Sequence, residues 1–356
     1  MSTRSLILRR SAHPLLLWLV LGYQCNNQCT HCYARHFQDQ SFLQEHVIEK
    51  VLHLLSYYMF QEVVFIGGEP TLYPNLKELT GKISKRVGKI SIVSNGSKLS
   101  SISFVKFLKE LDISYLNISI DDFSFTHSPT GSGTMSEIRF KGLYNALQVF
   151  GRESVSAVLT VGTQSKERLE TLLAKCNNTG LKTMAVNFAL PVVNNIKETP
   201  RFTIPPDEVT RRFEDLYHYF INKTMIQPLF YMNLPLCLFS IGFLKEIFSS
   251  GHALSGCHVF TGEGLVVDPS GNIIPCTHWV DMAEANITKD WEMIDNKQKF
   301  SVFWQQGKPY QLSRKICEIR DEKCLDCQFW GKLCLGGCPL SWLYYEPSNY
   351  IMGFSR

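Results

Sequence analysis

The segment that decides the expected fold is Leu15-Leu-Leu-Trp-Leu-Val-Leu-Gly-Tyr-Gln-Cys25-Asn-Asn-Gln-Cys29-Thr-His-Cys32. Its apolar run is typical of a buried strand in a parallel sheet. Directly after that run come three cysteines, separated by three and by two residues. Three thiolates on one short loop can hold three irons of a cubic 4Fe–4S cluster, and the fourth iron then has no protein ligand. An open metal position of this kind allows a substrate or cofactor to bind.

Zinc is the main alternative for these three cysteines. A structural zinc site takes four ligands, usually in two pairs. No further Cys or His follows at the spacing of a zinc finger, because His36 is too close to Cys32. The loop therefore favours an iron–sulfur cluster over zinc, and over a disulfide.

The first 225 residues or so alternate short apolar runs with longer amphipathic ones, which predicts alternating strands and helices. The predicted strands are Leu15–Leu21, Glu62–Ile66, Ile90–Ser94, Tyr115–Ile120, Ser154–Val161 and Thr183–Ala189. The predicted helices are 43–60, 75–87, 101–111, 135–150, 166–178 and 207–222. Such alternation gives an α/β protein with a parallel sheet, and six units predict an open, partial (β/α)6 TIM-like barrel. Ligands of parallel sheets bind at the carboxyl ends of the strands, where the cysteine loop falls.

The three-cysteine loop resembles the signature of the radical S-adenosylmethionine (radical SAM) superfamily. His31 stands where an aromatic residue is usual. The resemblance implies that the amino and carboxylate groups of SAM chelate the open iron. It also implies the reaction: a reduced cluster gives one electron to the sulfonium, and a 5′-deoxyadenosyl radical then abstracts a hydrogen from the substrate. The cofactor supplies the difficult chemistry, while the barrel aligns it and excludes water.

Further motifs of the superfamily follow the next strands. Gly67-Gly68-Glu69-Pro70 matches the GGEP motif, whose backbone and Glu bind the methionyl ammonium of SAM, and its glycines are expected to let the ligand approach the backbone. Polar residues at later strand ends are similar to those that contact the remainder of SAM: Ser94 and Asn95, Ser119 and Asp121, and Asn187. Turn capping is the alternative for Asn95 and Asp121.

One element of the superfamily is missing from its usual place. Many relatives carry an Arg near the carboxylate of SAM, roughly a dozen residues after the fourth strand. This sequence has His127-Ser-Pro-Thr130 there, with Arg139 further on. The group that recognises the carboxylate is therefore unassigned.

From about residue 230 the composition changes, and Cys, Gly, Pro and Trp become frequent. We expect an N-terminal tail at 1–13, the barrel at 14–230 and a small cysteine-rich domain at 231–356. Within the latter, Glu263–Cys276 reads as a β-hairpin with Asp-Pro-Ser-Gly-Asn as its turn. Cysteines of this domain run Cys257-x13-Gly271-x4-Cys276 and Cys324-x2-Cys327-x6-Cys334-x3-Cys338. This spacing resembles the SPASM domain, which carries auxiliary iron–sulfur clusters.

The resemblance implies two auxiliary 4Fe–4S clusters, but the usual last cysteine of SPASM is absent after Cys338. For one cluster we expect the ligands Cys317, Cys324, Cys327 and Cys334. For the other we expect Cys257, Cys276 and Cys338, with Cys237 as a candidate fourth ligand or, alternatively, as a hydrogen-atom donor. A structural zinc ribbon is the competing interpretation. Cys176, on a predicted helix, is expected to be buried.

SPASM-bearing relatives mostly modify peptides or proteins by crosslinking, epimerisation or oxidation, so the resemblance implies a peptide maturase. The alternative is a dehydrogenase or epimerase for a small molecule such as a sugar or aminocyclitol. A non-enzymatic metal-binding scaffold would leave the cysteine loop and Glu69 without a purpose. Because the barrel begins almost at the start of the chain, a peptide substrate would need a separate leader-recognition protein or direct docking. A flavodoxin or ferredoxin would supply electrons.

Net charge and hydropathy indicate whether nucleic acid or a membrane is an expected partner. The 356 residues carry a net charge of +4 with scattered basic residues, so no nucleic-acid partner is expected. The run Leu15–Leu21 is shorter than the roughly 20 residues of a membrane span, and no signal-peptide cleavage site follows it. We therefore expect a cytoplasmic protein without a membrane partner. In that reducing compartment, clustered cysteines indicate metal binding.

Overall fold

Strand β1 (Leu16–Val20) lies inside the sheet, with neighbours on both sides. The computed structural model describes residues 11, 13–37, 42–121, 135–192, 197, 199–254, 256–280 and 282–351. Most of the expected tail at 1–13, and the segment His127–Thr130, lie outside these ranges. Strand β1 pairs in parallel with β2 (Glu62–Ile66) and, on its other side, with β9 (Gly264–Val267).

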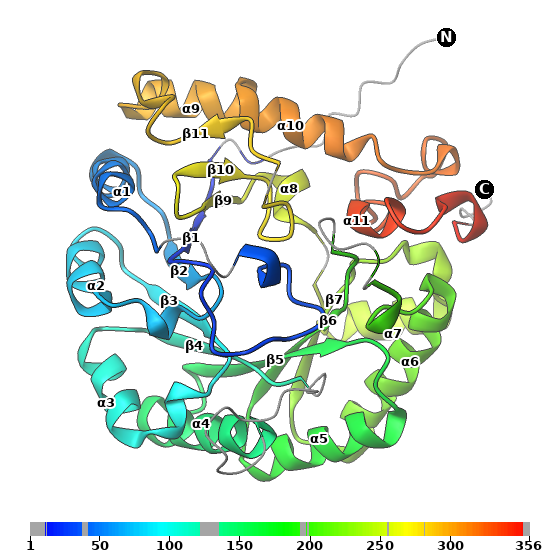
Figure 1. Cartoon of the computed structure of the whole chain (residues 1–356). Helices are drawn as coiled ribbons and strands as arrows, with labels where there is room; N and C mark the ends of the chain where they lie inside the picture. Colours follow the sequence, from blue (N-terminus) through cyan, green and yellow to red (C-terminus); the bar gives the residue numbers. More distant parts are fainter. Residues whose placement is uncertain are drawn as a thin grey trace.

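One sheet of eleven strands runs through the described parts of the chain, in the order β11-β10-β9-β1-β2-β3-β4-β5-β6-β7-β8 (Figure 1). Strands β1 to β8 are parallel and follow one another in chain order. The remaining strands are β3 (Ile90–Ser94), β4 (Tyr115–Ser119), β5 (Val155–Val161), β6 (Thr183–Phe188), β7 (Gln227–Tyr231), β8 (Ala253–Leu254), β10 (Asn272–Ile274) and β11 (Ala285–Asn286). The predicted parallel barrel is confirmed, and β7 and β8 extend it beyond the six expected strands.

The helices that cross between the strands form the outer layer of the barrel (Figure 1). They are α1 (Glu45–Tyr57), α2 (Leu76–Ser84), α3 (Ile102–Glu110), α4 (Met135–Phe150), α5 (Lys166–Asn178), α6 (Pro206–Lys223) and α7 (Ile241–Ser249). In α1, Val47, Val51 and Leu54 recur at helical spacing and are buried, so that one stripe of the helix faces the sheet. The first six helices confirm the sequence pattern to within a few residues at their ends.

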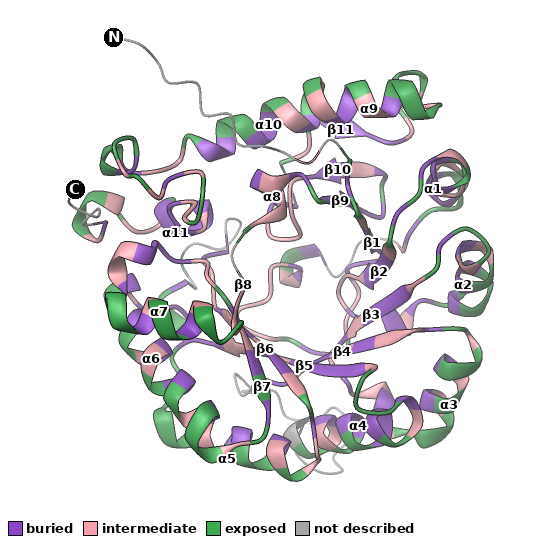
Figure 2. Ribbon diagram, turned by 180° about the vertical axis from the view of Figure 1, so that it is seen from behind, coloured by how far each residue is buried: buried purple, intermediate pink, exposed green. Residues whose placement is uncertain are grey.

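The two faces of each strand have different surroundings. Leu17 and Leu19 of β1 belong to the main core between the sheet and the helices, whereas Val20 belongs to a smaller cluster on the inner face. In β4, Leu116 and Ile118 are buried in the main core, while the alternate residue Asn117 is only half-buried. Figure 2 shows the buried residues concentrated in the strands and on the inward faces of the helices. The inner face therefore carries polar residues such as Asn117 beside a smaller apolar cluster.

The predicted hairpin is present and is part of the barrel sheet. Strands β9 and β10 are antiparallel, and the Asp268 carboxylate accepts hydrogen bonds from the backbone N–H groups of Ser270 and Asn272 in the turn. Gly271 has a φ of +83°, which favours glycine. The expected boundary near residue 230 falls inside β7, which pairs with β6, so one sheet runs across it.

Two helices in the C-terminal third were not expected. They are α9 (Lys297–Gln306) and α10 (Lys308–Cys317), and they lie beside β11 and β10 (Figure 1). Phe300, Phe303 and Trp304 bury one face of α9 at helical spacing. The same spacing can be read in the sequence, where the density of cysteines and glycines hides it. Short helices α8 (His258–Thr261) and α11 (Pro339–Trp342) complete this region.

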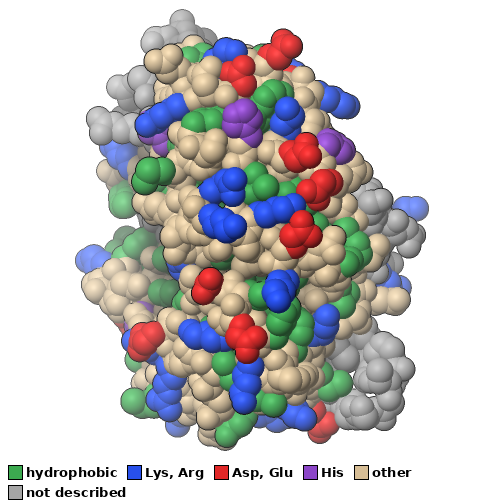
Figure 3. All heavy atoms as spheres, turned by 90° about the vertical axis from the view of Figure 1, so that its left-hand side faces the viewer, with side chains coloured by type: hydrophobic (Ala, Val, Ile, Leu, Met, Phe, Trp, Pro, Cys, Tyr) green, Lys and Arg blue, Asp and Glu red, His purple; other side chains and the backbone are tan. Residues whose placement is uncertain are grey.

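The face of the molecule that carries α1 and α2 has mixed charge. Figure 3 shows Lys and Arg side chains interspersed with Asp and Glu on this side. Lys82, for example, forms ion pairs with Glu45 and Glu78 at 3.1 and 2.8 Å. Among the helices in the described ranges, we find none that is both long and apolar enough to span a bilayer.

Candidate active site

The loops that follow β1 and β2 are in direct backbone contact at the carboxyl end of the sheet. The N–H of Gly68 donates to the carbonyl of Gly22 at 2.8 Å, and that of Glu69 donates to the carbonyl of Gln24 at 2.9 Å. A Cβ on Gly68 would lie 2.2 Å from the Tyr23 carbonyl oxygen. These glycines were expected to make room for a ligand. In the structure they make room for the backbone of the cysteine loop, which they hold in place.

Glu69 follows β2 and hydrogen-bonds residues at the end of β3. Its side chain is buried, and the residue is 2% exposed. Its Oε1 accepts hydrogen bonds from the Thr71 N–H, the Thr71 hydroxyl and the Ser94 hydroxyl, at 3.1, 2.7 and 2.9 Å. Its Oε2 accepts one, from the Asn95 N–H at 2.7 Å. Burial raises the pKa of this carboxyl, although the four hydrogen bonds oppose that effect. A carboxylate has about four acceptor positions, so Oε2 retains capacity for a further donor such as an ammonium.

Asn95 connects the third strand end to the cysteine loop. Its side-chain amide donates to the Asn26 side chain at 2.8 Å and approaches the Cys25 sulfur at 3.7 Å. Its Oδ1 accepts a hydrogen bond from the Ser97 N–H at 2.9 Å. Turn capping, the alternative interpretation of Asn95, is thus part of its role. The same side chain also reaches the candidate cluster ligand.

A buried ion pair lies on the other side of the cysteine loop. Arg139, from the first turns of α4, donates to the backbone carbonyl and to the carboxylate of Asp121, both at 3.1 Å. His31 Nε2 lies 3.6 Å from the same carboxylate. Burial alone would raise the pKa of Asp121, but His31 and Arg139 outweigh it and hold that pKa well below its usual range. The second guanidinium nitrogen of Arg139 is 3.9 Å from the Cys29 sulfur.

Arg139 is the main site residue that the sequence motifs did not assign. The superfamily pattern places an Arg nearer to the fourth strand, where this chain has His127–Thr130, outside the described residues. The signal that could have found it is a charged residue early in a predicted amphipathic helix that follows a strand-end Asp.

The three cysteines of the loop have the environment of metal ligands. Burial is the largest cause that raises the pKa of Cys29 to about 11 and that of Cys32 to about 12, and the neighbouring cysteine thiols add to the effect in Cys32. Hydrogen-bond donors point at the sulfurs, since the Asn27 N–H lies 3.4 Å from Cys25. Buried thiols with such donors suit a cluster, whose iron supplies the positive charge that thiolates need and whose sulfurs accept hydrogen bonds.

The surroundings of the loop also suit a zwitterionic ligand such as SAM. The Nε of Arg139 is buried and has no hydrogen-bond partner among the residues that the structure describes. The carboxylate of Glu69 lies one strand away from the cysteine loop. A cationic and an anionic group on either side of the cysteines match the carboxylate and the ammonium of SAM. By their chemistry these residues suit both groups, but in the described parts of the chain no three Cys, His, Asp or Glu side chains are arranged to hold a metal ion as they stand.

Two sequence candidates are not linked to this network in the structure. Ser119 ends β4 and Asn187 lies near the end of β6, and both are half-buried on the polar inner face. No hydrogen bond of either side chain to the residues above is present in the described parts of the chain. Their role in contacting SAM stays a prediction.

The C-terminal cysteines form two groups. Cys257, Cys276 and Cys338 pack against one apolar cluster, which includes Leu340 and Trp279. Their thiols are close enough for the charge of one to raise the pKa of another. A second group surrounds a cavity and contains Cys237, Cys324, Cys327 and Cys334. This differs from the expected sets, because Cys237 lies in the second group and Cys317, at the end of α10, is not among the described residues lining that cavity. None of the twelve cysteines forms a disulfide.

The first cysteine group lies next to the active-site loop. Tyr33 and His278 have ring centroids 5.1 Å apart, and Tyr33 donates to the Gly67 carbonyl at 3.2 Å. Tyr33 is also close enough to both Cys32 and Cys276 for their charges to raise its pKa, after the larger effect of burial. The side chain of Tyr33 thus connects Cys276 of the hairpin with Cys32 of the cysteine loop.

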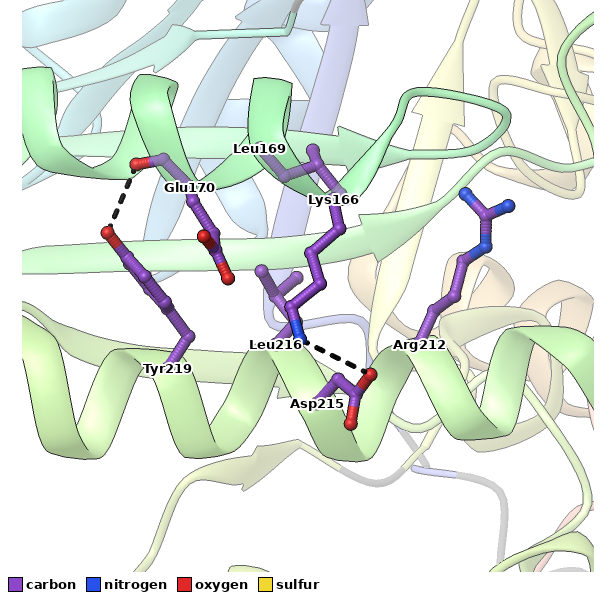
Figure 4. A pocket seen from close by; sticks show the side chains of 7 residues that line it. All are labelled: Lys166, Leu169, Glu170, Arg212, Asp215, Leu216 and Tyr219. Carbon is purple, nitrogen blue, oxygen red and sulfur yellow. Dashed lines mark hydrogen bonds and ion pairs between the residues drawn. The ribbon is translucent and has the colours of Figure 1, made fainter.

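A separate pocket of about 210 Å³ lies on the outside of the barrel between α5 and α6. Figure 4 shows its lining side chains, among them Lys166 and Asp215, which form an ion pair at 3.9 Å, and Tyr219, which donates to the Glu170 carbonyl. All of its lining residues belong to these two outer helices, away from the strand ends that carry the cysteine loop. The pocket is therefore not part of the candidate active site.

The chain is similar to known proteins in sequence and in fold. The family model of the Radical SAM superfamily matches residues 19–176. The chain is 32% identical over 149 residues to an S-adenosylmethionine-dependent nucleotide dehydratase of Flammeovirga pacifica, covering 38% of this chain and 50% of that protein. It is 29% identical over 136 residues to the Fe-coproporphyrin III synthase of Methanosarcina barkeri, covering 37% of this chain and 33% of that protein. The chain thus spans about half or less of these curated relatives.

Solved structures share the fold over nearly the whole chain. Streptococcus suis SuiB bound to S-adenosylmethionine superposes with a TM-score of 0.66 at 17% identity, covering 96% of this chain and 77% of SuiB. The protein anSMEcpe with bound AdoMet and the Cp18Cys peptide superposes with a TM-score of 0.63 at 18% identity, covering 91% of this chain and 89% of that one. At these identities the likeness concerns the fold.

Proposed function

We propose that this chain, whose residues 19–176 match the family model of the Radical SAM superfamily, cleaves SAM reductively and abstracts a hydrogen atom from a peptide or protein substrate. The observation that carries the proposal is the joint placement of Cys25, Cys29 and Cys32 between a buried carboxylate, Glu69, and a buried guanidinium, Arg139. A three-thiol loop flanked by both charges is an arrangement that a cluster-bound amino acid cofactor requires.

Each residue of the site has a proposed task. Cys25, Cys29 and Cys32 hold three irons of a 4Fe–4S cluster. Oε2 of Glu69 accepts a hydrogen bond from the ammonium of SAM, and Arg139 faces its carboxylate. When bound, the reduced cluster and SAM together supply a carbon radical strong enough to remove a hydrogen atom from the substrate. The buried hydrogen-bond network between the first three strand ends fixes the position of the cofactor and keeps water away from it.

A peptide or protein substrate is supported by the neighbours that share the fold. The anSMEcpe structure contains the Cp18Cys peptide, and another SuiB structure contains the precursor peptide SuiA. The resemblance includes the C-terminal region, since the SuiB superposition with SuiA covers 97% of this chain. We propose that this region is a SPASM domain that holds auxiliary clusters and contributes to the substrate cleft.

The first test is reductive SAM cleavage by the reconstituted protein. Iron per chain and 5′-deoxyadenosine after addition of dithionite and SAM would be compared in the wild type and a Cys25/Cys29/Cys32→Ala variant. Cys176→Ala is the matched control, because this cysteine is fully buried in the main core. We expect 5′-deoxyadenosine from the wild type and the control only. Its absence from the wild type would refute the proposed reaction.

The second test addresses the substrate class. A peptide encoded next to the gene would be produced with deuterated amino acids, and the 5′-deoxyadenosine would be examined for deuterium by mass spectrometry. Transfer of deuterium identifies the peptide as the hydrogen source.

A small-molecule substrate is the second candidate, because the relative from Flammeovirga pacifica is named as a nucleotide dehydratase. Stimulation of SAM cleavage by a nucleotide or sugar, with no transfer from any neighbouring peptide, would favour it.

A further inference from the structure

We propose that Cys237 is the fourth protein ligand of the auxiliary 4Fe–4S cluster held by Cys324, Cys327 and Cys334. The assignment gives this cluster four cysteines without the final cysteine of the SPASM pattern, and without Cys317. It concerns where iron binds and does not depend on the substrate proposed above.

The first argument is the shared cavity. Cys237, Cys324, Cys327 and Cys334 line one small cavity, together with Pro235, Lys323, Trp330 and Ile351. Four cysteines from two distant parts of the chain thus meet at one place. Four cysteines are the usual ligands of a 4Fe–4S cluster.

The second argument is the fixed position of the segment that carries Cys237. This residue lies in the short 3-10 turn Leu236–Leu238, after β7. The Leu236 backbone hydrogen-bonds the Cys334 thiol, and the carbonyl of Asn233 accepts a hydrogen bond from the Cys338 N–H at 2.7 Å. The two cysteine-bearing segments are thus held together by one backbone–backbone hydrogen bond and by one backbone contact to the Cys334 thiol.

The third argument is the wall around the cavity. Gly336 has a φ of +73°, and a Cβ there would lie 2.9 Å from the Trp330 ring and 3.5 Å from the Cys324 sulfur. Its N–H lies 3.3 Å from the Cys334 sulfur. Trp342 donates to the Gly336 carbonyl at 2.7 Å and packs in one apolar cluster with Trp330 and Cys324. Aromatic walls and backbone donors to sulfur are the surroundings that tune protein-bound iron–sulfur clusters.

Cys317 has a different environment. It is the last residue of α10 and is buried, and the cavity lining includes neither Cys317 nor any other residue of that helix within the described ranges. Sequence proximity to Cys324 suggested it as a ligand. The chain from Asn233 to Leu238 brings Cys237 to that place instead.

The experiment measures iron in the Cys25/Cys29/Cys32→Ala background, where only auxiliary clusters remain. Cys237→Ala, Cys317→Ala and the control Cys176→Ala would each be added and reconstituted anaerobically. Iron, sulfide and zinc per chain would be determined, together with the electron paramagnetic resonance spectrum of the reduced protein. We expect Cys237→Ala to lose between one and four irons and to change one spectral component. Cys317→Ala should leave that component as it is in the control.

A thiol-protection experiment on the wild type guards against misfolding of the variants. The iron-loaded protein and the chelator-stripped protein would be alkylated with iodoacetamide and mapped by mass spectrometry. We expect Cys237, Cys327 and Cys334 to react only after the iron is removed, because all three are partly exposed in the protein.

Equal labelling of Cys237 in both states, iron loss in Cys317→Ala alone, or zinc in place of iron would overturn the assignment. A normal iron pattern without 5′-deoxyadenosine would refute only the proposed function.

Discussion

Replacing Arg139 by Met tests whether the buried ion pair organises the site. The side chains of Arg139 and Asp121 are 4% and 6% exposed, and two hydrogen bonds of 3.1 Å join Arg139 to Asp121. Removing one partner of a buried pair leaves an uncompensated charge, at a cost of about 3–5 kcal/mol. His31 remains 3.6 Å from the carboxylate and offsets part of that cost. We therefore expect Arg139→Met to lower the free energy of unfolding by about 3 kcal/mol.

The assay is urea denaturation of the iron-free protein at neutral pH, followed by circular dichroism, with the m-value checked for constancy. Lys182→Met is the control, since Lys182 and Glu153 form an exposed pair with side chains 48% and 77% exposed. That variant should lose less than about 1 kcal/mol. In the double variant Asp121→Asn/Arg139→Met, the combined loss should fall short of the sum of the single losses by about 2 kcal/mol. A loss below about 1 kcal/mol for Arg139→Met, or strict additivity, would contradict this reasoning.

Three further outcomes follow from the contacts of the site. Gly68→Ala places a Cβ 2.2 Å from a backbone carbonyl of the cysteine loop, so it should reduce the iron content of the reconstituted protein, as measured by an iron assay. Gly81→Ala in α2 is the control, because a Cβ there meets nothing within 4 Å. Urea denaturation should show that this control variant is more stable by about 0.5–1 kcal/mol. Glu69→Gln keeps the shape of the side chain and removes its charge, so iron should be retained while SAM binding, measured by equilibrium dialysis, weakens about tenfold or more; unchanged SAM binding would count against the proposed ammonium contact. Stripping iron with a chelator should make residues 317–351 sensitive to limited proteolysis while the strands of the barrel stay protected, because metal binding stabilises the segments that supply its ligands; equal protection with and without iron would argue against auxiliary clusters there.

Local patterns predicted the barrel well. The six strand and helix units could be read from apolar runs and helical spacing, and the cysteine loop was placed at the carboxyl end of the first strand for the same reason. Strands β7 and β8 escaped the pattern because β7 contains Pro228 and β8 has two residues. Both pair with neighbouring strands, which a single segment cannot reveal.

The site depended more on contacts between distant residues. Glu69, Ser94 and Asn95 were expected because their motifs resemble those of the radical SAM superfamily, and they lie at or soon after strand ends, which the sheet brings together. Arg139 was not assigned, since its place depends on how the chain between β4 and α4 returns to the sheet. Cys237 was grouped by elimination among cysteines, and the spacing along the chain favoured Cys317. Which sulfurs face one cavity is decided by the packing of the loop after β7 against the C-terminal segment.

The parallel pairing of β1 with β9 has a consequence for biosynthesis. Leu16 pairs with Gly264, so the strand that leads into the cysteine loop has an unpaired edge until the ribosome has delivered most of the chain. During that interval the nascent barrel exposes an edge that can pair with other chains, and non-local pairing of this kind is slow. The apolar cluster in which Val266 and Ile274 cover Tyr23 and Phe37 is also absent until then. Strand β1 is therefore paired on both sides only after β9, far along the described chain, has been synthesised.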